Sequence, residues 1–156
     1  MLKRIVLTGG PGSGKTSVLE RIKQVYSSEG YKVIIVPETA TELMNNGISF
    51  RDGSISLVDF QELVMRLQLA KEEVVERAIE LSNSDKVIVI YDRGTIDNTA
   101  YIKKEEFEEI LARLNNVKSF ADLMNKYDMV INLVGREDFY TTENNKDETP
   151  DVCNSV

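Results

Sequence analysis

The glycine-rich run GGPGSGKTS at residues 9–17 constrains the fold more than any other part of the sequence. Residues 9–16 match the pattern G-x-x-x-x-G-K-[ST], which predicts a loop whose backbone N–H groups converge on the phosphates of a nucleotide. Such a loop needs a buried strand before it and a helix after it, because the N-terminus of the helix faces the anion. The residues predicted to form it are Gly9, Gly10, Pro11, Gly12, Ser13, Gly14, Lys15 and Thr16.

Two side chains of this loop have more specific expected roles. Lys15 can reach the β- and γ-phosphates, and the hydroxyl of Thr16 can ligate Mg²⁺. A glycine turn without a ligand is the alternative, but the apolar segment KRIVL before the run and the helical pattern after it are the context that the motif requires. We therefore expect a nucleoside triphosphate and Mg²⁺ to bind here.

Apolar runs alternate with helical patterns along the rest of the chain. The runs, typical of strands buried on both faces, occupy residues 3–9, 32–38, 86–94 and 128–135. Helical periodicity covers residues 14–30, 56–82 and 104–116, with a further turn or two around 118–126, and residues 45–56 have the composition of a loop. The predicted fold class is α/β: a parallel sheet of order 2-3-1-4, covered on both faces.

The longest predicted helix, at residues 56–82, is amphipathic. Ser56 is its expected N-cap, and Gly30 is the expected stop of the first helix. The apolar face of the long helix is predicted to hold Phe60, Leu63, Val64, Leu67, Val74, Ala78 and Leu81.

Asp92 and Arg93 follow the apolar run VIVIY. A carboxylate at this position, directly after a strand, can hold Mg²⁺ beside the phosphate loop, and a turn aspartate is the alternative. The neighbouring arginine can bind an acceptor or a transferred phosphoryl group through a bidentate contact, and a structural salt bridge is its alternative.

Glu38 lies just after the second strand, at the edge of the sheet where ligands bind in folds of this kind. Its carboxylate can accept the proton of an acceptor hydroxyl during phosphoryl transfer. It can equally be a helix-start carboxylate that interacts with the dipole of the segment TATELMNN that follows. The residues leave these two interpretations open.

The segment Asn125-Lys126-Tyr127-Asp128 spells N-K-x-D, the guanine-reading motif of GTPases. That motif belongs at the carboxyl end of a strand, whereas here it precedes the fourth apolar run. The pattern D-x-x-G is also absent after the third strand, because DRGT places glycine one position early. A GTPase switch is therefore disfavoured.

Composition narrows the class further. The 156 residues carry 19 basic and 26 acidic side chains, a net charge of −7, which disfavours binding to nucleic acid or to an anionic membrane. No histidine is present to act as a base or metal ligand, and the single Cys153 cannot form an intramolecular disulfide. The start MLKRIVLTGG does not resemble a signal peptide, so we expect a cytoplasmic protein with residues 1–156 as one domain.

Several segments together resemble a known family. GGPGSGKTS, VPETATEL, DFQELVMRLQLAKEE, YDRGTIDNTAYI and INLVG are similar to the NadR-like P-loop family, often described as an AAA-type ATPase domain, and the likeness covers nearly the whole chain. The family has the fold of P-loop nucleoside and nucleotide kinases, and its best understood branch phosphorylates nicotinamide riboside. The resemblance implies triphosphate contacts from Gly12 to Ser17, Mg²⁺ and acceptor roles around Asp92, and acceptor-side roles for Glu38, Arg93 and Asp97.

The same resemblance implies a lid at about residues 136–150 that supplies cations to the transferring phosphate. Arg136 is the only arginine there, and Lys146 stands where the family pattern has arginine, although lysine lacks the bidentate fork. Such folds also close with a fifth strand and a final helix, which we expect this chain to lack because it stops at DVCNSV.

The sequence thus favours an ATP·Mg²⁺-binding kinase that phosphorylates a hydroxyl of a nucleoside-like metabolite. Lys15, Glu38, Asp92, Arg93 and Arg136 are its expected catalytic residues, and GTP remains an alternative donor. A nucleotide-binding regulatory module, or an ATPase with little transferase activity, is the rival interpretation. The acceptor and the oligomeric state stay open.

Overall fold

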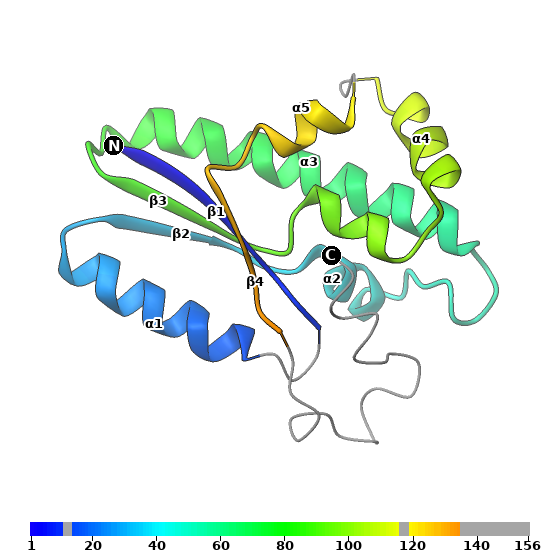
Figure 1. The fold of residues 1–156 in the computed structure, drawn as a ribbon, viewed down its shortest axis with the longest axis horizontal. Coiled ribbons are helices and arrows are strands. Elements are labelled where there is room, and N and C mark those ends of the chain that lie inside the picture. Colours follow the sequence, from blue (N-terminus) through cyan, green and yellow to red (C-terminus); the bar gives the residue numbers. More distant parts are fainter. Residues whose placement is uncertain (11–13, 116–118, 135–156) are drawn as a thin grey trace.

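The structure is a computed structural model and describes residues 1–10, 14–115 and 119–134 (Figure 1). Its strands are β1 (Leu2–Thr8), β2 (Lys32–Val36), β3 (Val87–Asp92) and β4 (Met129–Asn132). Its helices are α1 (Lys15–Ser28), α2 (Thr39–Asn45), α3 (Leu57–Ser82), α4 (Lys104–Arg113) and α5 (Phe120–Met124), with a 3₁₀ helix η1 (Thr95–Ala100). The predicted elements match to within a few residues at each end.

The strands form one parallel sheet of order β2-β3-β1-β4, which confirms the predicted fold class and strand order. The register places Leu7 of β1 beside Asp92 of β3, and Val36 of β2 beside Tyr91. Because all the strands run in one direction, the segments that follow β1, β2 and β3 leave the sheet at the same edge. The glycine-rich loop, Glu38 and Arg93 are among these segments.

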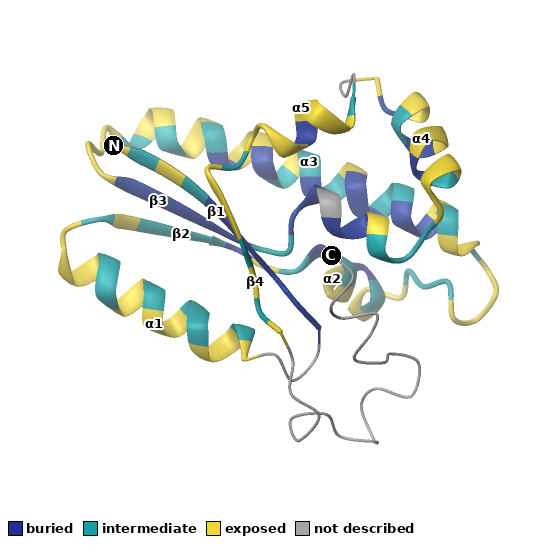
Figure 2. Cartoon of the chain, viewed as in Figure 1, coloured by how far each residue is buried: buried dark blue, intermediate teal, exposed yellow. Residues whose placement is uncertain are grey.

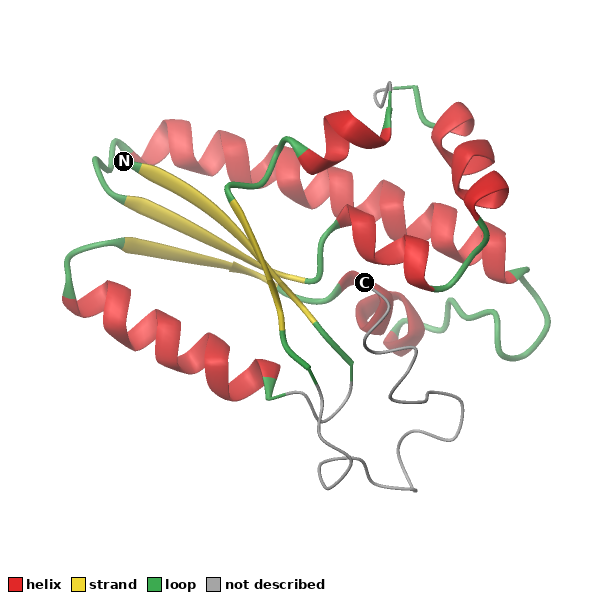
Figure 3. Cartoon of the chain, viewed as in Figure 1, coloured by secondary structure: helices red, strands yellow, loops and turns green. Residues whose placement is uncertain are grey.

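Successive residues of the strands face opposite sides of the sheet, and helices cover both sides (Figures 1 and 3). One side is formed by Ile5, Leu7, Ile88 and Ile90, against which α1 packs Val18, Leu19 and Ile22. The other side is formed by Val6, Val36, Val87, Val89 and Tyr91, against which α3 packs Val75 and Ile79. β1 is apolar from Ile5 to Leu7 and β3 from Val87 to Tyr91, because neither side of the sheet faces water there.

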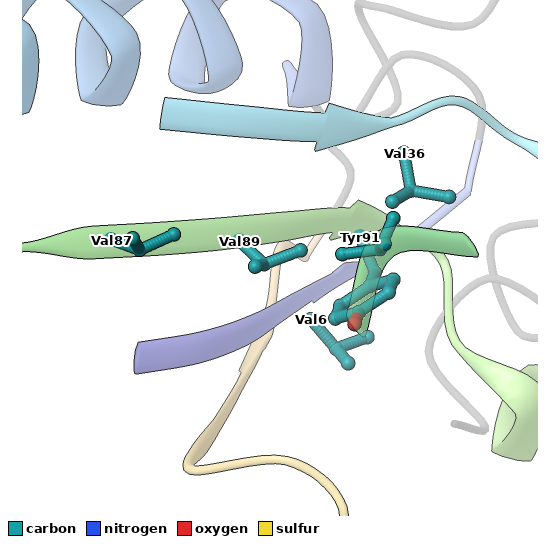
Figure 4. Close-up of a cluster of buried hydrophobic side chains, with 6 residues drawn as sticks. Val6, Val36, Val87, Val89 and Tyr91 are labelled. Carbon is teal, nitrogen blue, oxygen red and sulfur yellow. The ribbon is translucent and has the colours of Figure 1, made fainter. Parts of the chain in front are cut away.

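The centre of the sheet is the most completely buried part of the described chain (Figure 2). Figure 4 shows Val87, Val89 and Tyr91 spaced along β3, with Val6 and Val36 on either side of Tyr91. Burying one such apolar side chain stabilises the fold by about 1.5–3 kcal/mol. The strands that carry the candidate site are therefore the most strongly held elements.

Two predicted helix ends are confirmed. Ser56 caps α3, because its hydroxyl accepts a hydrogen bond of 3.0 Å from the Asp59 backbone N–H. Gly30, with φ of 85°, ends α1, and the backbone N–H of Tyr31 reaches back to the carbonyl of Tyr26 over 3.0 Å. The helical patterns include neither α2 nor η1, and a helix at α2 is expected only in the interpretation in which Glu38 starts one.

The predicted apolar face of α3 is wrong in its C-terminal half. Val74 and Leu81 are 69% and 66% exposed, and Ala78 is also exposed. The buried side holds Phe60, Gln61, Val64, Met65, Gln68, Glu72 and Val75. The buried side includes the polar residues Gln61, Gln68 and Glu72. A pattern of apolar residues alone therefore assigns the wrong face to the C-terminal half of the helix.

Within the part of the chain that the structure describes, no helix combines the length and the apolarity that crossing a membrane requires.

The corrected face of α3 can be tested with two adjacent valines. Val75→Ala should lower the free energy of unfolding by about 2 kcal/mol, because it removes buried methyl groups from the cluster with Val6 and Val89. Val74→Ala, the matched control, should change it by less than about 0.5 kcal/mol. Urea unfolding followed by circular dichroism measures both, and equal losses would contradict the corrected face.

Candidate functional site

The described ends of the glycine-rich loop have the backbone that the motif predicts. Gly14 is left-handed, with φ of 86°, and forms the N-cap of α1, so the chain turns from the loop directly into the helix. Gly9 and Gly10 are buried directly after β1. Of the predicted nucleotide contacts, Pro11, Gly12 and Ser13 lie outside the described residues.

The first turn of α1 presents the polar residues of the motif. The Nζ atom of Lys15 lies 4.0 Å from Oδ1 of Asp92, with 13% of the lysine side chain exposed. Thr16 and Ser17 are both exposed on the same turn. The N-terminus of α1 thus combines free backbone N–H groups, an ammonium group and two hydroxyls, a set suited to phosphates.

Asp92 ends β3 beside this turn. Its Oδ1 atom is buried and has no hydrogen-bond partner in the described structure. Burial raises the pKa of the Asp92 carboxyl, and the Glu38 carboxylate adds to this, while Lys15 and Arg93 oppose the shift. The surroundings of the carboxylate therefore disfavour its charged form. Carboxylates with a raised pKa are frequent at functional sites.

The residues present fit a Mg²⁺ ion. Mg²⁺ takes one or two protein oxygens and fills the rest of its octahedron with water and phosphate oxygens. The orphaned Oδ1 atom of Asp92 and the exposed hydroxyl of Thr16 offer such oxygens. The described residues contain no cluster of three or more acidic or cysteine side chains, so a metal here would need phosphate oxygens as further ligands.

Arg93 follows Asp92 with an unusual backbone. Its φ is 66°, in the left-handed region that non-glycine residues rarely adopt, and its N–H donates to the carbonyl of Leu7 over 2.8 Å. Its Nη1 atom donates to the hydroxyl of Tyr101, and its Nε atom lies 3.3 Å from Oε1 of Glu38. Burial alone would lower the pKa of the guanidinium, but Glu38 and Tyr101 raise it above the usual value. Arg93 is thus a fixed, permanently charged group.

Glu38 stands at the N-cap position of α2, yet its side chain makes no capping hydrogen bond. It forms an ion pair with Arg93 instead. This contact is not aligned as a hydrogen bond, since the buried Nε atom of Arg93 has no hydrogen-bond partner in the described structure. The arrangement combines the two interpretations: the residue starts a helix, and its carboxylate faces the site.

Asp97 is buried, with only 4% of its surface exposed. One carboxylate oxygen accepts the hydroxyl of Thr8 and the other accepts the backbone N–H of Gly94. Burial raises the pKa of Asp97, and these two hydrogen bonds oppose the shift. Both oxygens are engaged within the protein, so Asp97 ties the turn after β3 to the end of β1.

A cavity of about 100 Å³ opens beside the Glu38–Arg93 pair. Its apolar wall includes Phe50 and Phe60, its polar wall includes Gln61 and Gln68, and Arg51 lies on its lining as an exposed side chain. Sequence reasoning did not find these residues. The available signal was the pair of glutamines seven positions apart, in helical register with Phe60 on the otherwise apolar side of α3.

The remaining predicted features fall into two groups. Arg136, Lys146 and the expected lid at 136–150 lie outside the described residues, as does Cys153. The segment from Asn125 to Asp128 precedes β4, which confirms that it does not follow a strand as a guanine-reading motif would.

Comparison with known proteins identifies the family. Residues 4–154 match the family described as an AAA domain (AAA_28). The chain belongs to this family. It is also similar to the thymidylate kinase of Mesoplasma florum (strain ATCC 33453 / NBRC 100688 / NCTC 11704 / L1), with 32% identity over 101 residues, covering 62% of this chain and 47% of that protein. The matched part thus spans about half the length of the curated relative. The family and the parallel sheet of order β2-β3-β1-β4 together show the fold of a P-loop domain.

The buried carboxylate of Asp92 leads to a prediction about the free energy of unfolding. Asp92→Asn should stabilise the ligand-free protein at pH 7 by about 0.5–2 kcal/mol, because it removes a buried carboxylate that lacks a hydrogen-bond partner. The pKa of Asp92 is raised in the folded state, so the folded protein binds this proton more tightly than the unfolded chain does. The charged carboxylate therefore lowers the free energy of unfolding only above about pH 4, where the unfolded chain would lose this proton. The difference between the variant and the unaltered protein should shrink toward zero near about pH 3.

Urea unfolding of both proteins at a series of pH values measures this difference. Asp52→Asn is the matched control, because Asp52 is exposed and its pKa is lowered by hydrogen bonds from Ser54. It should give no gain at neutral pH. A loss of stability in Asp92→Asn at pH 7 would show that the pairing with Lys15 outweighs burial.

Proposed function

We propose that this protein is an ATP- and Mg²⁺-dependent kinase that transfers the γ-phosphoryl group to a hydroxyl of a small, nucleoside-like acceptor. The observation that carries the proposal is the position of the cavity. It opens beside Glu38 and Arg93. Arg93 directly follows Asp92, the residue that faces Lys15 of the phosphate loop. A donor site and a separate acceptor site thus share one edge of the sheet, as transfer between two substrates requires.

The donor half would be held by the loop and the first turn of α1. Backbone N–H groups and Lys15 would contact the phosphates of ATP, while Thr16 and Asp92 would hold Mg²⁺. When bound, the metal neutralises charge on the β- and γ-phosphates. The protein adds little covalent chemistry in such reactions, so positioning and electrostatic stabilisation supply most of the rate.

The acceptor half has the composition of a pocket for a flat, polar ring. Phe50 and Phe60 supply aromatic surface, with their ring centroids 5.2 Å apart. Gln61 and Gln68 also line the cavity, and their amide groups can recognise the donors and acceptors of a heterocycle. The nicotinamide riboside kinases that the sequence resembles and the thymidylate kinase relative both suggest acceptors of this class.

Arg93 and Glu38 would divide the work at the point of transfer. Arg93, fixed by Tyr101 and by its backbone, would bind the phosphoryl group as it moves. Glu38 would accept the proton of the attacking hydroxyl, because its carboxylate lines the cavity and is not aligned with Arg93 in a hydrogen bond. The proton leaves the acceptor oxygen as that oxygen bonds to phosphorus, and ADP leaves with the electron pair of the broken bond.

The proposal is tested by nucleotide turnover with a panel of acceptors. ATP and GTP should each be assayed as donors with nucleosides, nicotinamide riboside and thymidine monophosphate, with product detected by mass spectrometry. At least one acceptor should raise turnover clearly above basal hydrolysis. Tight nucleotide binding without any stimulated turnover would instead favour the regulatory module or simple ATPase.

The position of Arg51 allows the panel to be refined. Arg51 is an exposed cation among the residues that line the cavity, close to Phe50. If the preferred acceptor carries a phosphate, Arg51→Gln should raise the KM for that acceptor. If the preferred acceptor is a neutral nucleoside, the same variant should change its KM little.

Glu38→Gln tests the proposed base. Transfer to the acceptor should fall by about 10²–10⁴-fold, because the amide cannot take the hydroxyl proton, whereas ATP affinity should stay within about twofold. Glu42→Gln is the matched control, since Glu42 lies one turn away in α2 and pairs with Lys71 instead. Full transfer by Glu38→Gln would reduce Glu38 to a structural partner of Arg93.

A further inference from the structure

A buried carboxylate that the proposed reaction does not use lies in the middle of α3. Glu72 is only 6% exposed. Its Oε1 atom accepts hydrogen bonds from Nε2 of Gln68 over 3.1 Å and from the hydroxyl of Tyr127 over 2.7 Å. Its Oε2 atom lies 3.5 Å from Nζ of Lys126. A buried acid is costly unless it is paired in this way, so its partners point to its role.

One branch of the contacts leads to the acceptor cavity. Gln68 and Thr39 both line the cavity, and the hydroxyl of Thr39 donates to Oε1 of Gln68 over 2.6 Å. Lys71 in turn lies 3.4 Å from the Thr39 hydroxyl oxygen and can donate to it. Glu72 is therefore linked to the polar wall of the cavity through a single side chain, Gln68.

The other branch leads to the turn that carries Arg93. The hydroxyl oxygen of Tyr127 lies 3.2 Å from the backbone N–H of Thr95, which donates to it. The ring of Tyr127 lies flush against Gly94, where an added Cβ atom would come within 3.1 Å of the tyrosine oxygen. Tyr127 thus packs against the turn directly after Arg93. The left-handed backbone of Arg93 is costly and persists only where surrounding contacts hold it.

The Glu72 carboxylate fixes the direction of the hydrogen bonds that Gln68 and Tyr127 make with it. An ionised carboxylate can only accept, so Gln68 must point its amide nitrogen toward Glu72 and its oxygen toward Thr39. For the same reason Tyr127 must donate its proton to Glu72, which leaves its oxygen free to accept from Thr95. One charge therefore orients a cavity amide and, at the same time, holds the turn of Arg93.

We propose that Glu72 and Tyr127 are positioning residues of the acceptor site: together they fix the amide orientation of Gln68 and the backbone of the turn at residues 93–95. The proposal rests on the proposed function for its kinetic consequence, but its structural part stands without it. It also assigns Tyr127 a role that differs from reading a guanine base.

Two conservative variants test the proposal. Tyr127→Phe keeps the ring against Gly94 and removes only the hydroxyl. Glu72→Gln keeps the shape and replaces an obligatory acceptor by an amide that can also donate, so the Gln68 amide can turn over. Matched controls are Glu73→Gln, an exposed neighbour on the same helix, and Tyr31→Phe, whose hydroxyl contacts the sulfur of Met1.

The first measurement is hydrogen exchange at the backbone N–H of Thr95, which needs no substrate. Exchange should be at least about tenfold faster in Tyr127→Phe and in Glu72→Gln than in the unaltered protein, and unchanged in both controls. Thermal unfolding of each variant reports whether the whole fold has loosened instead. Unchanged exchange at Thr95 in a folded Tyr127→Phe protein would overturn the proposal.

The second measurement is the steady-state kinetics of the best acceptor. In both variants kcat/KM for the acceptor should fall by about 10- to 100-fold, while the KM for ATP stays within about twofold. The double variant should lose little more than either single one, because the two residues act as one unit. Additive losses, or equal losses for ATP and acceptor, would mark the network as merely structural.

The two measurements separate this proposal from the proposed function. If no acceptor is phosphorylated by the unaltered protein, the proposed function fails, while the exchange at Thr95 still decides whether Tyr127 holds the turn. If transfer occurs and exchange rises as expected but the acceptor kinetics do not change, the proposed function stands and the positioning role is overturned.

Discussion

The parallel pairing of β1 with β3 is the interaction on which the candidate site depends. β1 leads into the phosphate loop, and β3 leads into Asp92 and Arg93, so the register between these strands determines which residues meet. The hydrogen bond from the Arg93 backbone N–H to the Leu7 carbonyl extends this pairing past the end of β3. The site is thus positioned by backbone hydrogen bonds at the centre of the sheet.

Most of the fold could be predicted because neither face of the central strands meets water. Continuous apolar runs, a glycine-rich loop and a helix after it leave few arrangements other than a parallel sheet with β1 at its centre. The short elements were predicted unevenly: α5 was expected, α2 only in one interpretation of Glu38, and η1 not at all, since a 3₁₀ helix lacks the 3.6-residue period. The face of α3 was misplaced because Gln61, Gln68 and Glu72 are polar and nevertheless buried.

The proximity of Lys15 and Asp92 could be predicted from the sequence, but the cavity beside Glu38 and Arg93 could not. Lys15 and Asp92 belong to local motifs whose context along the chain can be checked directly. The cavity, in contrast, is assembled from a loop, two helices and the turn after β3, so its lining depends on which way α3 is rotated. The left-handed backbone of Arg93 had no sequence signal either, because the contacts around it, Arg93 with Leu7 and Gly94 with Tyr127, join segments that are distant along the chain.

The two halves of the site also differ in how their polar groups are satisfied. In the acceptor half, Thr39, Gln68 and Glu72 already hydrogen-bond to one another, so their orientation is set before a ligand arrives and little ordering remains to be done on binding. In contrast, Oδ1 of Asp92 in the donor half and Nε of Arg93 at the point of transfer are buried and have no hydrogen-bond partner among the described residues, which costs stability in the ligand-free protein. Ligands that bind to these two atoms would raise the free energy of unfolding again. On the proposed function, binding of the donor would therefore raise the stability at Asp92 and Arg93, whereas the polar groups of the acceptor half are ordered before binding.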